Sequence, residues 1–176
     1  MILEGLNQSE DTARWYALHV RSRHEYRVRE QLIGAGIEEF LPLVERLRRW
    51  KDRKKLVAFP LFPGYLFVHV TKKPAIMVDI LKMYGVVRFL GITPTQPLPV
   101  PDGQIASLQK LIATKAPLDP YPYLKEGQQV NIVRGPLAGA SGYLIEKRDR
   151  HLFVVAIDIL KQGAAVKIDA SDVEAC

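Results

Sequence analysis

The chain has 176 residues, of which 48% are hydrophobic and 25% are charged, and its formal net charge is +6. This composition is typical of a soluble protein with a core and excludes a disordered chain, and no segment reaches the roughly 18 apolar residues that a membrane-spanning helix needs. The single cysteine, Cys176, excludes an internal disulfide and a cysteine cluster for a metal, so we expect no cofactor and a reducing, cytoplasmic setting.

The positive charge is concentrated in the first part of the chain. Residues 1–112 carry 17 Lys and Arg against 11 Asp and Glu, whereas residues 113–176 carry 8 against 8. Within residues 46–55 there are seven basic residues and one acidic residue. A field of this kind suits a polyanion, because phosphate binding releases condensed counterions. The pattern predicts nucleic-acid contact, with a solvated surface hairpin as the alternative.

The N-terminal half predicts alternating strands and helices. We expect a disordered tail over residues 1–13 and a strand over 15–20. Ser22 and Glu25 have capping-box spacing for the helix that follows, and Gly34–Gly36 end it. A second strand over 38–44 then leads into a basic hairpin, and the nearly unbroken apolar run "YLFVHV" predicts a central strand.

Two further helices are expected beyond this strand. Pro74 suits a first helical turn, and Met77, Ile80, Leu81 and Tyr84 recur at helical spacing before Gly85. "VVRFL" predicts a strand, and a third helix begins near residue 102. The order β-α-β-β-α-β plus a helix indicates an α+β fold, with an antiparallel sheet packed against helices.

The chain changes character near residue 113. Residues 113–124 hold three prolines in a short span and predict a linker, so the first domain is expected over 14–112. Short strands at nearly regular spacing over 125–176 predict a small β-barrel as the second domain.

The segments "WYALHVRSRHEYRVREQL", "LFPGYLFVHV" and "GVVRFLG" resemble the N-terminal domain of the NusG family of transcription elongation factors. "EGQQVNIVRGPLAGASGYLIE" resembles the KOW motif that follows it in that family. The resemblance implies an N-terminal NGN domain joined to an SH3-like KOW barrel. The "RSRHE" turn and the basic insertion are more similar to the specialised paralogues of the RfaH, UpxY and LoaP types than to the housekeeping factor.

The resemblance implies a protein partner for the aromatic corner "FPGY". In the family, an apolar pocket of the N-terminal domain receives the clamp helices of the largest subunit of bacterial RNA polymerase. The residues that would surround this pocket here are Trp15, Tyr16, Phe62, Pro63 and Tyr65. Phe67 is assigned to the core.

The resemblance also implies a single-stranded DNA partner. In specialised paralogues, the first strand–helix turn faces the non-template strand of the transcription bubble. The matching residues here are Arg21, Arg23, His24 and Arg27, and from the basic hairpin we add Arg49, Arg53 and Lys54. A solvated surface is the alternative for both groups. The His-Thr-Thr stretch of RfaH-type proteins is replaced by Ile76–Val78.

In the second domain, Leu137, Ala140 and Leu160 stand where the housekeeping factor carries phenylalanines that meet Rho or a ribosomal protein. These three residues are therefore the candidates for contact with such a partner, and the smaller side chains suit a specialised antiterminator that avoids Rho. Some RfaH-type proteins switch this domain between a helical hairpin and a barrel; the β-rich run "LFVVAIDIL" favours the barrel.

The residues give no convincing catalytic set. The four histidines are not at metal-ligand spacing, and Glu38–Glu39 is interpreted as a surface pair. We therefore expect a monomeric binding protein without a membrane partner. The resemblance implies that it is a transcription antitermination and elongation factor that suppresses pausing and termination. An RNA-binding or ribosome-associated KOW protein is the alternative.

Overall fold

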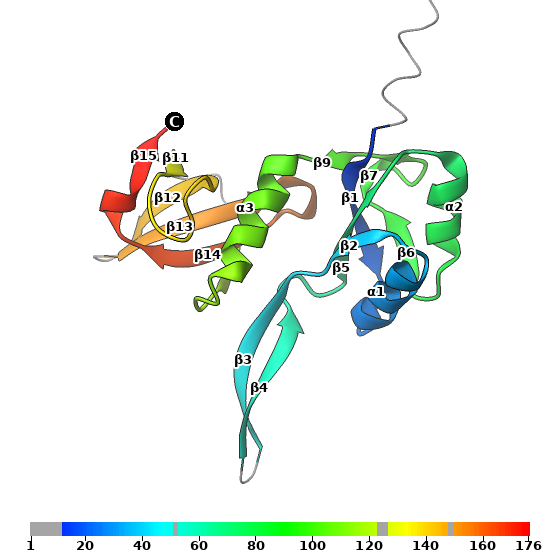
Figure 1. The fold of residues 1–176 in the computed structure, drawn as a ribbon, viewed down its shortest axis with the longest axis horizontal. Helices are drawn as coiled ribbons and strands as arrows, with labels where there is room; N and C mark the ends of the chain where they lie inside the picture. The colour runs from blue at the N-terminus through cyan, green and yellow to red at the C-terminus, as the bar shows by residue number, and fades with distance from the viewer. Residues whose placement is uncertain (1–11, 51–52, 123–126, 148–149) are drawn as a thin grey trace, which may run out of the picture. The chain divides into compact units, whose positions relative to one another are not determined.

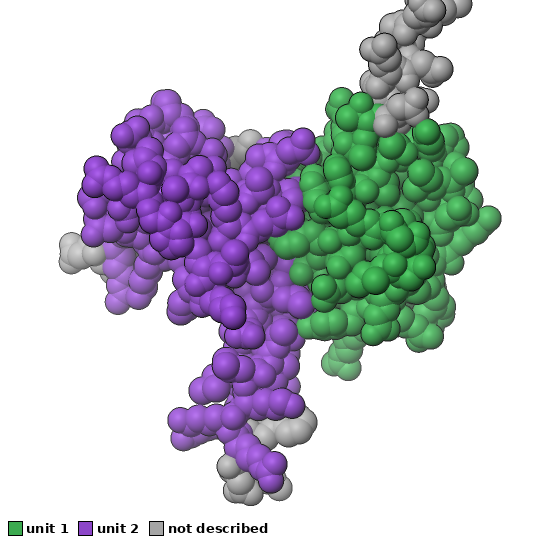
Figure 2. All heavy atoms as spheres, viewed as in Figure 1, with its two compact units in different colours: residues 1–41, 63–100 green, residues 42–62, 101–176 purple. Residues whose placement is uncertain are grey.

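The computed structural model describes residues 12–50, 53–122, 127–147 and 150–176 (Figure 1). The predicted disordered tail falls outside them except for residues 12 and 13. The chain divides into two compact units, residues 1–41 with 63–100 and residues 42–62 with 101–176 (Figure 2). None of the helices in the described ranges is long and apolar enough to cross a membrane.

The first unit is built on an antiparallel sheet in the order β2-β5-β1-β6, with β9 also paired to β1. Its strands are β1 (Arg14–Val20), β2 (Glu38–Phe40), β5 (Tyr65–Val70), β6 (Val86–Phe89) and β9 (Pro99–Val100). A two-stranded ribbon of β7 (Gly91–Thr93) and β8 (Gln96–Pro97) was not predicted. The expected α+β order and the central place of β5 are confirmed.

Two helices cover one face of this sheet. They are α1 (Glu25–Gly34) and α2 (Pro74–Lys82). The apolar side chains of Val28 and Leu32 on α1 and of Ile80 on α2 are fully buried. Because side chains alternate along a strand, the buried residues Tyr16, Leu18, Val20, Leu66 and Val68 share one face of β1 and β5. The helices pack on that face, and the other face carries a different set of side chains.

Two details of the predicted helices are wrong. The N-cap of α1 is His24 without a side-chain cap hydrogen bond, so the expected capping box does not form. The Glu25 carboxylate accepts a hydrogen bond from the Gly64 amide instead. Helix α2 ends at Lys82, and Met83 has an extended backbone, so Tyr84 leaves the helical stripe and is 52% exposed.

The basic segment forms the expected hairpin of β3 (Leu43–Trp50) and β4 (Arg53–Pro60). The strand predicted over 38–44 is divided, because β2 ends at Phe40 and β3 begins at Leu43. Residues 51 and 52 lie outside the described ranges. The hairpin pairs with itself over eight residue pairs, from Leu43 with Pro60 to Trp50 with Arg53.

The C-terminal part is a six-stranded antiparallel sheet in the order β10-β14-β13-β12-β11-β15. Its strands are β10 (Asp119–Pro122), β11 (Gln128–Ile132), β12 (Ser141–Lys147), β13 (Arg150–Ile157), β14 (Gln162–Ile168) and β15 (Val173–Ala175). The short 3-10 helices η1 (Asp158–Leu160) and η2 (Ala170–Asp172) join the last strands. This is the C-terminal β domain expected from the sequence.

Helix α3 (Asp102–Ala113) groups with this sheet in the second unit. In addition, part of the segment predicted as a linker forms β10, which pairs with β14. β10 contains two prolines, which have no backbone N–H to donate. The strand can still form because it lies at the edge of the sheet and has a neighbouring strand on one side only. The predicted domain boundaries at 112 and 124 stay a prediction.

Candidate functional site

An aromatic face lies on the side of the first sheet opposite α1 and α2. The ring of Trp15 stacks on His69 with centroids 4.9 Å apart, and its edge meets Phe40 at 6.4 Å. Tyr65 stacks on His19 at 5.3 Å. Phe67 is fully buried and Trp15 is 9% exposed, whereas the other four rings are half-buried. We call Trp15, His19, Phe40, Tyr65, Phe67 and His69 the aromatic face.

The strand register separates the residues predicted to meet the polymerase. Trp15 and Tyr65 share the aromatic face, because their partners are His69 and His19 in the β1–β5 ladder. Tyr16 lies on the other face and packs edge-on against Phe89 at 6.2 Å. Burial raises the pKa of the Tyr16 hydroxyl, and the charge of Arg14 opposes this. Because successive side chains of a strand point to opposite faces, the adjacent positions of Trp15 and Tyr16 in a predicted strand already indicate that the two side chains lie on different faces.

The remaining two predicted residues precede β5. Phe62 is buried with 1% of its surface exposed, whereas Pro63 is exposed. Gly64 takes a φ of +83°, which favours glycine, and its carbonyl accepts a hydrogen bond from the Val20 amide at 2.8 Å. The corner that precedes Tyr65 is therefore fixed to the end of β1.

A second cluster forms where β1 passes into α1. The guanidinium of Arg27 lies 4.5 Å from the ring centre of Tyr84, and that of Arg21 lies 5.7 Å from it. The His24 ring lies 5.5 Å from the same ring, tilted by 51°. Cations over an aromatic face are attracted by the ring quadrupole. We call Arg21, His24, Arg27 and Tyr84 the Tyr84 cluster.

The backbone around Tyr84 is held in place from α1. The Gln31 side chain donates to the Tyr84 carbonyl at 2.9 Å and accepts from the Tyr84 amide at 3.0 Å. The Arg21 amide donates to the Gly85 carbonyl at 2.8 Å. Three of the four residues predicted in the arginine turn thus surround Tyr84. The fourth, Arg23, is exposed and has a left-handed φ of 63°.

Sequence reasoning missed the roles of Tyr84 and Gln31. The helical spacing predicts Tyr84 as a member of the apolar stripe of α2, because it continues the period of that helix. The proximity of Gln31 to Tyr84 depends on a contact between residues 53 positions apart. The adjacent glycine, Gly85, is the available sign that the helix ends before this point.

The hairpin presents its cations on both faces. Arg49, Arg53 and Lys54 are exposed, as predicted for a solvent-facing ribbon. Arg49 lies directly opposite Lys54, and Leu47 opposite Leu56, each leucine 59% exposed. Like charges opposite one another destabilise a strand pair, so the Arg49–Lys54 pair does not stabilise the hairpin.

The three residues predicted to meet a partner of the C-terminal domain are all buried. Leu137, Ala140 and Leu160 are 8%, 0% and 7% exposed. Helix α3 lies beside them. Three of its side chains form hydrogen bonds with backbone groups one or two residues away from these positions. Lys110 donates to the Ala138 carbonyl at 2.8 Å. Ser107 accepts from the Ser141 amide at 3.0 Å, and Gln104 accepts from the Asp158 amide at 3.2 Å.

Glu38 and Glu39, which were predicted to be a surface pair, each contact another side chain through the carboxylate. Glu39 is largely buried and forms a 2.8 Å ion pair with Arg29, so it is not a surface residue. Glu38 is exposed and lies 2.6 Å from the His69 ring nitrogen. Both contacts tie β2 to its neighbours.

Comparison with known proteins agrees with this architecture. The family model described as transcription termination factor nusG matches residues 13–109. The transcription termination/antitermination protein NusG of Pseudomonas aeruginosa is 26% identical, with 92% of this chain and 97% of that protein covered. The protein of the same name from Thermus thermophilus is 28% identical, with coverage of 90% and 96%.

A solved structure of a NusG protein also matches over nearly the whole chain. It is described as "Domain interaction in Thermotoga maritima NusG", has a TM-score of 0.51 and 24% identity, and the match covers 93% of this chain and 97% of that one. At this identity the match shows the fold.

Proposed function

The chain belongs to the NusG family of transcription termination and antitermination proteins, and we propose that it binds RNA polymerase through its aromatic face and the non-template DNA strand through its Tyr84 cluster. Bound in this way, it holds the polymerase clamp closed and suppresses pausing and termination. The aromatic face, on which four of the six rings are partly exposed, is the single observation that carries this proposal.

The aromatic face suits a helical protein partner. Half-exposed rings on a strand surface offer large contact area and lose little side-chain entropy on binding. Pro63 and Tyr65 are the proposed main contacts with the clamp helices, and Trp15, which is 9% exposed, contributes the part of its ring that remains accessible. His19 and His69 support the two rings. Tyr16 and Phe62 are buried, so they serve the fold rather than direct contact with the partner.

The Tyr84 cluster suits a single strand. Every base has a π-face that can stack on an exposed ring, and adjacent guanidinium groups neutralise the phosphates. Tyr84 is the proposed stacking platform, with Arg21 and Arg27 as the phosphate contacts and His24 at its edge. Arg23 extends the same basic surface. The hairpin residues Arg49, Arg53 and Lys54 are proposed as further DNA contacts.

The partner of the C-terminal domain is proposed to compete with α3. Leu137, Ala140 and Leu160 are covered while Gln104, Ser107 and Lys110 hold the neighbouring backbone. A ribosomal protein or Rho would reach them only after α3 moves. The small size of the three side chains favours a specialised paralogue that binds Rho weakly, acting as a cytoplasmic monomer.

The test is single-round transcription by purified bacterial RNA polymerase on a template with known pauses. We expect faster escape from pauses with this protein and none of that effect with Tyr65→Asp, because a charge on the aromatic face opposes apolar docking. Ile33→Asp is the matched control, since Ile33 is 56% exposed on α1, on the other side of the sheet. Unchanged pausing with the wild-type protein on every template would overturn the proposal.

The second candidate is an RNA-binding KOW protein, which the Tyr84 cluster and the basic hairpin also suit. The two functions respond differently to salt. Apolar docking to polymerase persists at high salt, whereas binding to RNA phosphates weakens steeply. Loss of all binding in high salt, with arginine substitutions more harmful than Tyr65→Asp, favours this second function.

A further inference from the structure

A short stretch of strand edge is open in the C-terminal sheet. β10 pairs with β14 only from Asp119–Ala165 to Pro122–Gln162, whereas β14 continues to Ile168. Beyond Ala165, β14 is paired with β13 and with no other described strand. The outer strand β10 contains two prolines, which cannot donate from the backbone. An added strand could therefore form backbone hydrogen bonds with residues 166–168 of β14, rather than with β10.

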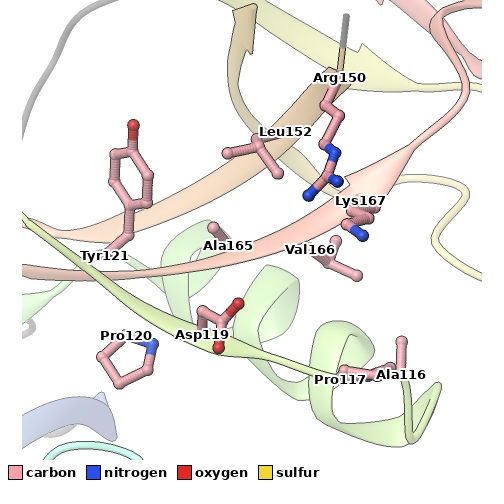
Figure 3. Close-up of a pocket in the computed structure, with 10 residues that line it drawn as sticks. All are labelled: Ala116, Pro117, Asp119, Pro120, Tyr121, Arg150, Leu152, Ala165, Val166 and Lys167. Carbon is pink, nitrogen blue, oxygen red and sulfur yellow. The ribbon is translucent and has the colours of Figure 1, made fainter. Parts of the chain in front are cut away.

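A cavity of about 760 Å³ lies at this place (Figure 3). Its apolar lining includes Leu152, Val166 and the two prolines Pro117 and Pro120, and Tyr121 forms one wall. Such a lining favours side chains that leave water on binding. We call this cavity with the adjoining β14 edge the β10–β14 groove.

Two cations share one end of the groove. Arg150 stands two residues before Leu152, whose cross-strand partner is Lys167, so all three side chains share one face of β13 and β14. Figure 3 shows the guanidinium of Arg150 and the ammonium of Lys167 at the same end of the cavity, and both also line the neighbouring cavity. Neither side chain makes an ion pair or hydrogen bond with another residue in the described ranges. Two adjacent like charges repel, and an incoming anion relieves this.

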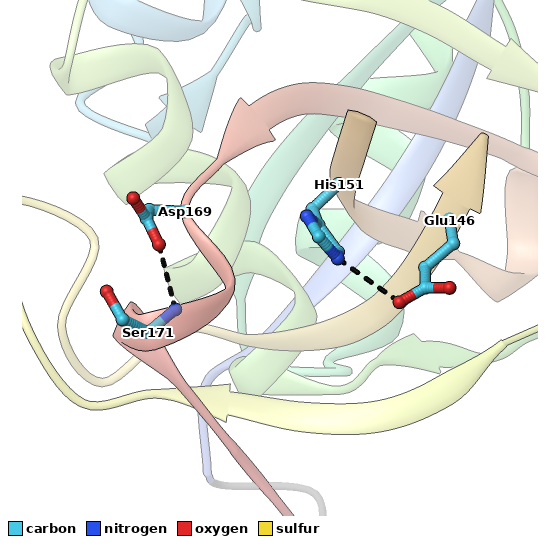
Figure 4. Close-up of polar contacts among 4 residues, drawn as sticks. All are labelled: Glu146, His151, Asp169 and Ser171. Atoms are coloured by element: carbon cyan, nitrogen blue, oxygen red, sulfur yellow. Dashed lines mark hydrogen bonds and ion pairs between the residues drawn. The ribbon is translucent and has the colours of Figure 1, made fainter. Parts of the chain in front are cut away.

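Two of the nearby acidic groups make hydrogen bonds to other residues. Glu146 bonds to His151 across the β12–β13 pair at 3.1 Å, and Asp169 accepts from the Ser171 amide at 3.0 Å (Figure 4). The hydrogen bonds from Ser171 also hold the pKa of Asp169 below its ordinary value. Asp119 lines the groove on the β10 side without an ion pair to either cation in the described ranges. No carboxylate in the described ranges forms an ion pair with Arg150 or Lys167, although Asp169 lines the neighbouring cavity with them, so an acidic ligand can supply one.

We propose that the β10–β14 groove binds an extended acidic segment of a protein partner. The segment adds a strand to β14 at residues 166–168, its apolar side chains enter the cavity, and its carboxylates meet Arg150 and Lys167. A peptide fits better than a nucleic acid, because residues 113–176 carry 8 basic and 8 acidic residues and the cavity lining combines apolar side chains with two cations. This site is separate from the residues proposed to meet polymerase or DNA.

The test is fluorescence anisotropy of the full chain with a short fluorescein-labelled peptide of alternating glutamate and valine. We expect saturable binding, and about tenfold weaker binding for Arg150→Glu combined with Lys167→Glu, since loss of two exposed ion pairs removes about 1.4 kcal/mol in total. Lys167→Gln is the milder variant and is expected to weaken binding less. Arg134→Glu, an exposed arginine outside the groove, is the matched control and should bind as the wild type does.

Strand addition has its own readout. Amide hydrogen exchange at residues 166–168 should slow when the peptide is bound, and a peptide with glutamine in place of glutamate should bind much more weakly. Three results would overturn the proposal: no binding of the acidic peptide, equal weakening with Arg134→Glu, or displacement of the peptide by a single-stranded oligonucleotide. None of these results depends on transcription activity, so the groove proposal can be disproved without affecting the proposal that the chain binds polymerase.

Discussion

The backbone amide of Gly64 donates a 2.8 Å hydrogen bond to the carboxylate of Glu25, which lies 39 residues earlier in the chain and is 4% exposed. This bond ties the corner before Tyr65 to the first turn of α1. A helix N-terminus favours a negative charge, so Glu25 is stabilised at this position while it holds the corner. The aromatic face therefore depends on a buried polar contact at its border.

Glu25→Ala is expected to lower the free energy of unfolding by about 2 kcal/mol, because the Gly64 amide loses a charged acceptor inside the protein. Glu25→Gln keeps an acceptor oxygen and should cost less. Urea unfolding followed by tryptophan fluorescence measures both. Glu30→Ala, on the exposed side of the same helix, should stay within about 0.5 kcal/mol of the wild type. Equal effects of the Glu25 and Glu30 substitutions would show that the bond does not stabilise the fold.

Tyr84→Ala is expected to weaken single-stranded DNA binding by about 1–3 kcal/mol, which is the usual contribution of one stacked base. Tyr84→Phe keeps the ring and should retain most of the affinity. Anisotropy of a labelled single-stranded oligonucleotide measures this, with Tyr26→Ala as the control because Tyr26 is a similarly exposed tyrosine. A phenylalanine variant as weak as the alanine variant would rule out stacking as the source of affinity.

Arg49→Ala combined with Lys54→Ala is expected to leave stability unchanged or slightly raised, because two opposed like charges are removed from an exposed strand pair. If these residues meet phosphates, the slope of log affinity against log salt should fall by about 1 for each phosphate that is no longer neutralised. Thermal melting and DNA binding at several salt concentrations measure the two effects. Arg134→Ala is the control. A salt slope equal to that of the wild type would favour the solvated-surface interpretation of the hairpin.

Ser107→Val is expected to destabilise the second unit by about 1–3 kcal/mol, because the Ser141 amide loses its acceptor at a buried serine that is 3% exposed. Amide exchange at residues 137–141 should become faster as α3 loosens. Ala106→Val, one position earlier on the exposed side of α3, is the matched control for the branched side chain. Unchanged exchange in Ser107→Val would mean that α3 does not protect Leu137 and Ala140.

Much of the secondary structure could be predicted from local patterns. The aromatic and β-branched content of "WYALHV", the apolar run "YLFVHV" and the proline at the start of α2 correspond to β1, β5 and α2 in the structure. The paired basic strands and the short strands of the C-terminal sheet were also predicted correctly. These features depend on residues close together in the chain, where steric and hydrophobic periodicity acts directly.

The features that were missed depend on contacts between distant residues. β10 forms because β14 offers an edge to a proline-containing segment, and Tyr84 is held by Gln31 from another helix. Glu25 bonds to Gly64 rather than capping its own helix, because a buried amide needs an acceptor more than an exposed helix end does.

The order of the elements, the family resemblance and the uneven charge could all be derived from the linear sequence, since each is carried by neighbouring residues. The three-dimensional arrangement was needed to show that Trp15 and Tyr65 share a face without Tyr16, and that two arginines gather around Tyr84. It was also needed to place α3 beside the buried residues of the C-terminal sheet. Strand register and helix docking bring these groups together, and both are set by packing over a whole unit rather than by any local segment.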